Sequence, residues 1–279
     1  MNDIIETVNL VSEYITDEGN KSIKAIDDLN LAIKRGDFTA IIGKNGSGKS
    51  TFAKNTNALL LPSGGAVYVN GYDTKDENRT WDIRQTVGMV FQNPDNQLVS
   101  SVVEDDVAFG PENMGIDPDE IRVRVDDALN AVGMYELRKM APHLLSGGQK
   151  QSIAIAGVIA MKPECIVFDE PTAMLDPSGR REVMGIIGEL NAGGITTVLI
   201  THFMDEAAAA DRVIIMDNGK VALDGTPKEV FRDAGLMESL SLDVPFAVRM
   251  AQRLRKKGVA VPEDVTDVQE LVEYICQYR

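Results

Sequence analysis

The sequence predicts an α/β fold with a mainly parallel β-sheet flanked by helices, because short β-branched runs alternate with helical stretches along most of the chain. Two further features complete this prediction. Antiparallel strands are expected at the start of the chain, and one long helical stretch interrupts the alternation. The predicted strands are residues 4–10, 38–42, 67–69, 87–91, 165–168, 196–201 and 212–216.

Helical segments account for much of the remaining chain. From residue 94 to about residue 161 the pattern is mostly helical, and Asp117 with Pro118 forms a helix start ahead of a one-sided apolar row. We interpret this stretch as a helical insertion in a domain of residues 1–232. Residues 233–279 are expected to form a C-terminal helical extension, whose clearest one-sided apolar spacing comes from Val268, Leu271, Val272 and Ile275.

The composition of the chain excludes several classes of protein. The chain has 279 residues, 44% of them apolar, which is enough for a hydrophobic core. Its 28 basic and 43 acidic residues give a net charge of -15, which repels duplex nucleic acid and anionic lipid. Cys165 and Cys276 have no metal-site spacing, so we expect no disulfide and a reducing compartment. No apolar stretch is long enough to span a membrane, and the first residues do not have the pattern of a secretion signal.

A glycine-rich segment, GKNGSGKST at residues 43–51, lies between the strand 38–42 and a helical stretch. This spacing and context are those of a phosphate-binding loop, with a ligand-free glycine turn as the alternative. The glycines let backbone amides turn toward the β- and γ-phosphates of a nucleotide, Lys49 adds a positive charge, and Ser50 adds a hydroxyl for Mg²⁺. The expected nucleotide-binding residues are Gly43, Asn45, Gly46, Ser47, Gly48, Lys49, Ser50 and Thr51.

Three more side chains follow the carboxyl ends of buried strands, where the ligands of parallel sheets gather. Asp169 and Glu170 end the run CIVFDE, and His202 follows the apolar run TTVLI. We expect Asp169 to hold Mg²⁺ through water, Glu170 to orient or deprotonate an attacking water, and His202 to reach a γ-phosphate. The alternatives are two carboxylates that cap a loop and a structural histidine.

A second anion-binding surface is predicted within LLSGGQKQS, residues 144–152. Its Ser-Gly-Gly opens an apolar helical run, so the amides of a helix N-terminus point outward with no side chains to shield them. The residues concerned are Ser146, Gly147, Gly148 and Gln149. One chain therefore carries two phosphate-binding surfaces.

The ordered segments GKNGSGKST, FQNPDNQ, LSGGQ, CIVFDE, AMLDP and TH resemble those of the ATP-binding-cassette ATPases over roughly residues 3 to 230. The resemblance implies the P-loop cassette fold, ATP and Mg²⁺ as ligands, and ATP hydrolysis. It also implies that two such domains pair head to tail, so that residues 146–149 of one domain touch the γ-phosphate held by the other. The second anion surface then serves the partner's nucleotide.

The resemblance assigns further positions. Tyr14 is expected to stack on adenine, and Gln92 to contact Mg²⁺ or the attacking water and to couple the site to the helical insertion. Asp176 is expected to cross the dimer seam. The alternative for Tyr14 is an aromatic residue at a strand edge, and the alternative for Gln92 is an ordinary amide at a strand end. The alternative for Asp176 is a helix N-cap, which is compatible with the role at the dimer seam. Ser152 departs from the family, which usually has arginine there, and this puts domain stability or coupling in question.

Two longer segments, FQNPDNQLVSSVVEDDVAFGPENMG and DEPTAMLDPSGRREV, resemble the ATPase subunits of energy-coupling-factor transporters, above all the first of the two paralogous ATPases of the vitamin importers. In that family the helix after the glutamine loop contacts a transmembrane subunit, which places the contact surface between Asn93 and Val107. Leu98, Val99, Val102 and Val103 lie there beside the acidic residues 104–106, and this mixture suits an arginine-bearing partner helix. The alternative is a local helix that packs on its own domain. The C-terminal extension is expected to help hold the dimer together, or to pack on its own sheet.

The expected function is the ATP-binding and ATP-hydrolysing subunit of an energy-coupling-factor importer of vitamins or other micronutrients, driven by head-to-tail dimer closure. Its expected partners are a second cassette ATPase, a transmembrane coupling subunit and, indirectly, a substrate-binding membrane subunit, but no nucleic acid. Its expected place is the cytoplasmic face of the cell membrane. The alternatives are a cobalt or nickel importer ATPase, a soluble cassette ATPase without transport, and a module that assembles without hydrolysis. Substrate choice is assigned to the membrane subunit, and both a heterodimer of paralogues and a homodimer remain open.

Overall fold

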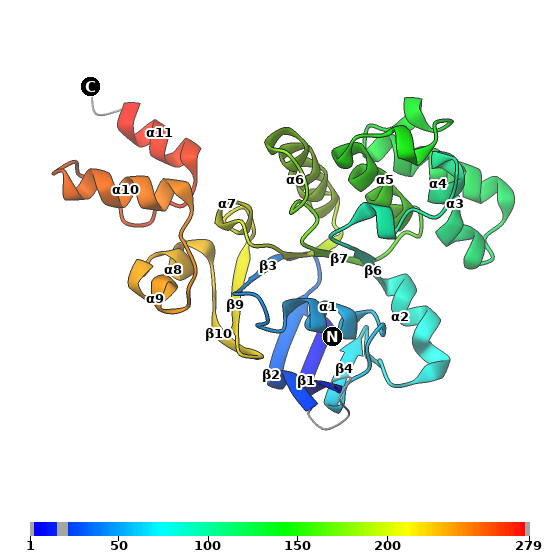
Figure 1. Cartoon of the computed structure of the whole chain (residues 1–279), viewed down its shortest axis with the longest axis horizontal. Helices are drawn as coiled ribbons and strands as arrows, with labels where there is room; N and C mark the ends of the chain where they lie inside the picture. The colour runs from blue at the N-terminus through cyan, green and yellow to red at the C-terminus, as the bar shows by residue number, and fades with distance from the viewer. Residues whose placement is uncertain (1–2, 16–21, 277–279) are drawn as a thin grey trace.

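The computed structural model describes residues 3–15 and 22–276, and two sheets form its framework (Figure 1). Across the antiparallel sheet the strands are β2 (Ser22–Lys34), β1 (Asp3–Ile15), β4 (Gly64–Val69) and β5 (Tyr72–Asp73). Across the second sheet they are β10 (Lys220–Gly225), β9 (Arg212–Asp217), β3 (Phe38–Ile42), β8 (Thr196–Ile200), β7 (Cys165–Asp169) and β6 (Val87–Val90). Every pair in the second sheet is parallel except β9 with β10.

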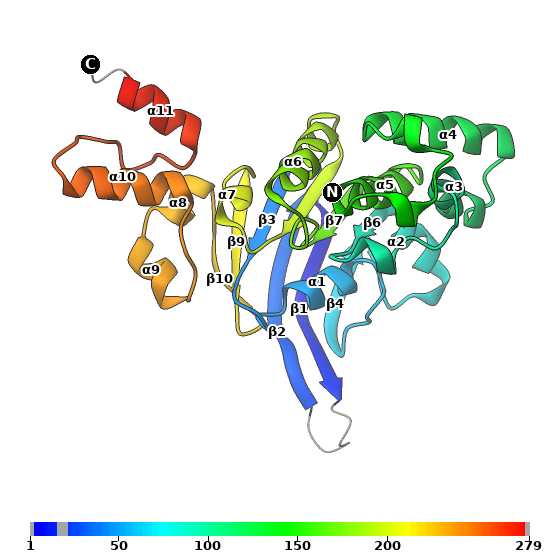
Figure 2. The same ribbon diagram turned by 45° about the horizontal axis from the view of Figure 1, so that its top comes forward.

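The prediction of a mainly parallel sheet with antiparallel strands at the start is confirmed, and each predicted strand is present. The structure adds β2, β5 and β10. Strand β2 carries Asp27, Asp28 and Asn30, residue types that are uncommon in strands. Pairing with β1 along most of its length overrides that local preference. Figure 2 shows β1 and β2 as a long ribbon that extends away from the six-stranded sheet.

The expected helical insertion lies between β6 and β7. It contains α3 (Val103–Asn113), α4 (Pro118–Ala131) and α5 (Gly147–Ile159), with 3₁₀ turns at Pro94–Asn96, Tyr135–Leu137 and Pro142–Leu144. Helix α4 begins as predicted, because the Asp117 side chain accepts a hydrogen bond from the backbone N of Asp119, and Pro118 lies in the first turn. The boundaries of the insertion and of the two larger divisions stay a prediction.

The remaining helices cover the sheets and form the end of the chain. Before β10 the chain forms α1 (Lys49–Thr56), a 3₁₀ turn at Glu77–Arg79, α2 (Thr80–Thr86), α6 (Pro177–Ala192) and α7 (Met204–Ala207). After β10 it forms α8 (Pro227–Phe231), α9 (Ala234–Ser239), α10 (Phe246–Lys256) and α11 (Val268–Cys276). Figure 1 shows α10 and α11 at the opposite end of the molecule from the helical insertion.

The predicted apolar face of α11 packs only in part within this chain. Leu271 is buried with Ala247, Ala251 and Val265 in a small separate core. By contrast, Val268, Val272 and Ile275 are 49%, 51% and 42% exposed. The one-sided spacing therefore predicts a helix correctly, but most of its apolar face is open to solvent.

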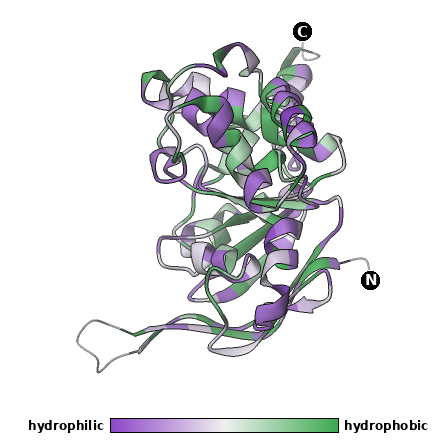
Figure 3. Cartoon of the chain, turned by 90° about the vertical axis from the view of Figure 1, so that its right-hand side faces the viewer, coloured by the Kyte–Doolittle hydropathy of each residue, from purple (hydrophilic) through white to green (hydrophobic). Residues whose placement is uncertain are grey.

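Strands β3, β7 and β8 are buried at every residue, as expected of parallel strands covered on both faces. One apolar core lies between this sheet and the helices of the insertion together with α6, and a second lies between the two sheets and α1. In Figure 3 the central strands are green, while the outer faces of the helices are largely purple. Both cysteines are free, Cys165 buried and Cys276 exposed. Across residues 3–15 and 22–276, no helix has the length and apolar character needed to cross a bilayer.

Candidate functional site

The phosphate-binding loop connects β3 to α1 and depends on glycine at two positions. Gly43 and Gly48 have φ angles of 154° and 104°. A Cβ on Gly43 would lie 2.2 Å from the carbonyl oxygen of Met216, and a Cβ on Gly48 would lie 2.6 Å from that of Ala25. Neither position accepts a side chain, so the backbone amides at the start of α1 stay uncovered.

Lys49 begins α1 and turns back into the loop. Its Nζ donates hydrogen bonds to the carbonyl oxygens of Gly43 at 2.7 Å and Lys44 at 3.1 Å. The residue is only 5% exposed, and burial lowers the pKa of its ammonium group, although Glu170 and Asp169 act in the opposite direction. The structure therefore holds one positive charge at the centre of the glycine loop.

Ser50 and Asp169 provide oxygen ligands of the kind that Mg²⁺ prefers. The Ser50 hydroxyl donates a hydrogen bond to Asp169 Oδ1 at 2.9 Å, which joins the start of α1 to the carboxyl end of β7. Burial raises the pKa of Asp169, and the Ser50 hydrogen bond opposes that shift. A partly buried carboxylate beside a hydroxyl and below a phosphate loop fits a magnesium site that keeps several waters.

Glu170 and His202 meet where β7 and β8 end side by side. His202 Nε2 lies 2.5 Å from Glu170 Oε1. The hydrogen bond from His202 lowers the pKa of the Glu170 carboxyl, which keeps this group ionised, while burial opposes the shift. Glu170 has a φ of 53°, a left-handed conformation that non-glycine residues seldom adopt. The two predicted catalytic residues are therefore brought together by the sheet order.

Tyr14 lies beside the phosphate loop, although it comes from the antiparallel sheet. Its hydroxyl is 3.1 Å from the Thr51 hydroxyl in α1, and its side chain is 39% exposed. A ring held at this position and open to solvent is consistent with stacking on an adenine base. That role stays a prediction.

Gln92 is exposed and lies two residues after the end of β6, on a segment that α5 holds in place. Gln97 accepts a hydrogen bond from the backbone N of Phe91 at 3.2 Å and donates one to the carbonyl oxygen of Ala154 in α5 at 3.3 Å. Gln151 of α5 donates to the carbonyl oxygen of Phe91 at 3.2 Å. The sequence analysis did not single out Gln97 or Gln151, and the only local signal was that Gln97 ends the FQNPDNQ segment.

The second predicted anion surface is the N-terminus of α5. The Ser146 hydroxyl accepts a hydrogen bond from the backbone N of Gln149, and the Gln149 side chain accepts one from the backbone N of Ser146. This reciprocal capping box leaves Gly147 and Gly148 without side chains at the helix end. Ser152, further along α5, is buried and donates to the carbonyl oxygen of Gly148 at 3.1 Å. It is therefore satisfied by its own helix.

Asp176 is the N-cap of α6, where its side chain accepts a hydrogen bond from the backbone N of Gly179 at 3.0 Å. A pocket of about 380 Å³ joins Asp176 to Ser146, Gly147 and Gly148. No residue of the phosphate loop lines that pocket. Asp176 therefore lies beside the second anion surface, in a pocket that does not include the phosphate loop.

Comparison with known proteins identifies the family. A family model described as "ABC transporter" matches residues 26–173, and one described as "Energy-coupling factor transporter EcfA1 C-terminal domain" matches residues 245–279. The chain belongs to the ABC transporter family. Within it, the chain groups with energy-coupling factor ATP-binding proteins: the protein EcfA1 of Clostridium novyi is 58% identical over 277 residues, 99% of both chains. As a member of this family, the chain is an ATP-binding ATPase coupled to transport.

Solved structures of ABC proteins have the same fold. The structure of cbiO1 from Clostridium perfringens, described as part of the ABC transporter complex cbiONQ, is 39% identical with a TM-score of 0.76 and covers 92% of this chain and 98% of that one. The ATP-binding cassette MJ0796, solved as a dimer bound to ADP and Pi, is 30% identical with a TM-score of 0.71. The match covers 80% of this chain and 98% of that one. The predicted P-loop cassette fold is confirmed.

Proposed function

We propose that this ABC ATPase hydrolyses ATP to energise an energy-coupling-factor importer of vitamins or other micronutrients, at the cytoplasmic face of the cell membrane. The contact between Glu170 and His202 carries the proposal. Both side chains lie at the carboxyl edge of the sheet that also holds Asp169 and Lys49. Such an arrangement suits in-line attack of water on a γ-phosphate rather than nucleotide binding alone.

The residues of the site divide the reaction between them. Lys49 and the amides of the loop bind the β- and γ-phosphates, while Ser50, Asp169 and Gln92 would hold Mg²⁺. When bound, Mg²⁺ neutralises charge on the phosphate oxygens. Glu170 orients the water and accepts its proton, and His202 holds the carboxylate in place and reaches the γ-phosphate.

We further propose that closure of a head-to-tail dimer with a second ABC ATPase, a paralogue, completes the site. The uncovered N-terminus of α5 and Asp176 line a pocket that lacks the phosphate loop of their own chain. A helix N-terminus stabilises a nearby anion by about 0.3 to 2 kcal/mol. Because the γ-phosphate would meet this surface only in the closed dimer, ATP binds the closed state more tightly and shifts the population toward it.

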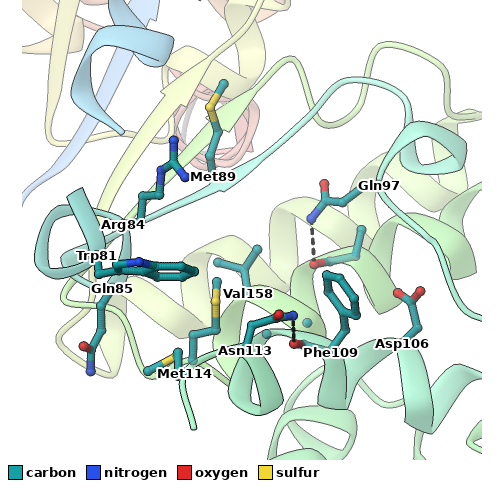
Figure 4. Close-up of a pocket in the computed structure, with 14 residues that line it drawn as sticks. Trp81, Arg84, Gln85, Met89, Gln97, Asp106, Phe109, Asn113, Met114 and Val158 are labelled. Atoms are coloured by element: carbon teal, nitrogen blue, oxygen red, sulfur yellow. Dashed lines mark hydrogen bonds between the residues drawn. The ribbon is translucent and has the colours of Figure 1, made fainter. Parts of the chain in front are cut away.

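The docking site for the transmembrane subunit is proposed to be a groove of about 720 Å³ between α2, α3 and α5. Figure 4 shows Trp81 and Phe109 on either side of Val158 in this groove. Trp81 is 64% exposed and Phe109 is 51% exposed. Large apolar side chains exposed around a groove are typical of a site for a partner helix.

The groove presents one acidic and one basic side chain. Asp106 is 9% exposed, and its Oδ1 accepts hydrogen bonds from the backbone N of Val99 at 2.7 Å and of Ser100 at 2.8 Å. Arg84 of α2 also lines this mainly apolar groove. In the proposed complex Asp106 pairs with a basic residue of the partner helix, and Arg84 pairs with an acidic one.

Two residues of the predicted contact surface between Asn93 and Val107 are not available to a partner. Val103 and Val107 are fully buried, because they lie on the inner face of α3 and pack in the main core. Of this segment, Gln97 and Asp106 line the groove. The proposed surface therefore lies more on α2 and α5 than the sequence predicted.

Removing the two aromatic residues tests the groove. We expect the double variant Trp81→Ala, Phe109→Ala to recover about tenfold less transmembrane subunit than the wild type in co-purification, because buried aromatic anchors dominate interface energies. Thermal stabilisation by MgATP should be unchanged, since neither side chain contacts the phosphate loop. Val123→Ala is the matched control, an exposed apolar residue of α4 outside the groove. Equal recovery of the membrane subunit by the double variant and the control would refute the docking site.

A cobalt or nickel importer is the second candidate for the cargo. The identity of the membrane subunits that co-purify with the chain distinguishes a vitamin importer from a cobalt or nickel importer. The same experiment distinguishes a homodimer from a heterodimer of paralogues.

A further inference from the structure

A buried carboxylate with no part in the mechanism above lies behind the catalytic pair. Glu206 in α7 is 5% exposed. One of its oxygens accepts a hydrogen bond from the Thr172 hydroxyl at 2.7 Å, and the other accepts one from the Thr201 hydroxyl at 2.5 Å. Thr172 comes two residues after Glu170, and Thr201 directly precedes His202. A single side chain thus joins the two loops that carry the catalytic pair.

The loop that carries Glu170 is in a conformation that needs support, and the loop that carries His202 is closed by a hydrogen bond. Glu170 has a left-handed φ of 53°, which costs free energy unless the surroundings hold it. In the loop that carries His202, the Thr201 hydroxyl also accepts a hydrogen bond from the backbone N of Phe203 at 3.0 Å, so it closes the turn that contains His202. The hydrogen bonds to Glu206 therefore help to hold the backbone at both catalytic positions.

The environment of Glu206 argues against a merely incidental contact. Burial raises the pKa of this carboxyl, while the hydroxyls of Thr201 and Thr172 oppose the shift. The nearest cation, Arg180, has its Nε 3.7 Å away and stacks over the ring of Phe203. A carboxylate is costly to bury, and it stays buried only where specific hydrogen bonds satisfy it.

We propose that Glu206 is a positioning residue for ATP hydrolysis: through Thr172 and Thr201 it fixes the relative placement of Glu170 and His202. The inference rests on the proposed function, because it requires Glu170 to act on the attacking water. A carboxylate suits this place because its two oxygens accept from both hydroxyls at once. Glutamine keeps one acceptor and replaces the other with a donor, so Glu206→Gln should retain part of the effect.

The test measures kcat and KM for ATP in the transporter complex that contains the full chain. We expect Glu206→Ala to lower kcat by about 10- to 100-fold, since misplacement by about 1 Å costs on the order of 10²-fold. KM and thermal stabilisation by MgATP should stay within about twofold, because the phosphate loop is untouched. Glu206→Gln should lie between Glu206→Ala and the wild type.

Variants of Thr201 keep the proposal falsifiable if Glu206→Ala does not fold. Thr201→Ser retains the hydroxyl and should keep the wild-type kcat, whereas Thr201→Val removes it and should lower kcat in the same way as Glu206→Ala. Equal kcat values for the serine and valine variants would overturn the proposal. The matched control is Asp205→Ala, the neighbouring acid, whose side chain accepts a hydrogen bond from the backbone N of Phe246 rather than from Thr172 or Thr201.

A comparison with Glu170→Gln separates this inference from the proposed function. If Glu170→Gln hydrolyses ATP at the wild-type rate, the proposed catalytic role itself is wrong. If Glu170→Gln is inactive while Glu206→Ala keeps the wild-type kcat, the catalytic role stands and the positioning role is wrong. A selective fall in kcat for Glu206→Ala and Thr201→Val, with Thr201→Ser unaffected, supports both.

Discussion

Glu170→Gln is expected to lower the rate of ATP hydrolysis by about 10²- to 10⁴-fold, the usual contribution of general-base catalysis, while ATP still binds. The amide has the shape of the carboxylate but cannot take a proton from water. Lys49 and the loop amides, which bind the phosphates, keep every contact. Because the nucleotide stays intact, the variant should accumulate as a closed dimer in MgATP.

Two measurements check this result. Phosphate release gives the rate, and size-exclusion chromatography of the chain together with its partner ATPase, with and without MgATP, gives the dimer fraction. Glu77→Gln makes the same chemical change at an exposed position and should behave as the wild type. Hydrolysis by Glu170→Gln at the wild-type rate would show that another group activates the water.

Lys49→Ala is expected to abolish tight nucleotide binding. Its Nζ lies inside the glycine loop, where it donates hydrogen bonds to the carbonyl oxygens of Gly43 and Lys44. At a ligand concentration of 100 times Kd, binding stabilises a folded protein by about 2.7 kcal/mol. The variant should lose nearly all of that stabilisation at the same MgATP concentration.

Thermal unfolding with increasing MgATP measures this loss directly. Lys257→Ala is the matched control, because Lys257 is an exposed lysine at the end of α10, outside the phosphate loop. The control should keep the wild-type protection. Full protection of Lys49→Ala by MgATP would mean that the charge of Lys49 has no part in holding the phosphates.

The sequence predicts the sheet and the catalytic edge well for a physical reason. Buried parallel strands read as continuous apolar runs, so β3, β7 and β8 are visible without a structure. The polar residues that follow such strands must gather at one edge of the sheet. That rule places Asp169, Glu170 and His202 near the phosphate loop, and the structure brings Asp169 to Ser50 and His202 to Glu170.

Other features depend on contacts between distant segments and leave little local signal. Gln97 accepts from the backbone N of Phe91, Gln151 donates to the carbonyl oxygen of the same residue, and Glu206 accepts from Thr172. Nothing in the spacing of these residues indicates their partners. The fully buried Val103 was misplaced on the surface because helical spacing alone does not say which face of α3 packs inward.

The central claim is that this ATPase works in a membrane importer together with a second cassette. Affinity purification of the tagged full chain from solubilised membranes, with mass spectrometry of the chains recovered, tests it most directly. The account predicts recovery of a second ABC ATPase, a transmembrane coupling subunit and a substrate-binding membrane subunit, all in amounts comparable to the bait. Recovery of the chain without any membrane subunit, or with ribosomal or DNA-associated proteins in their place, would contradict it.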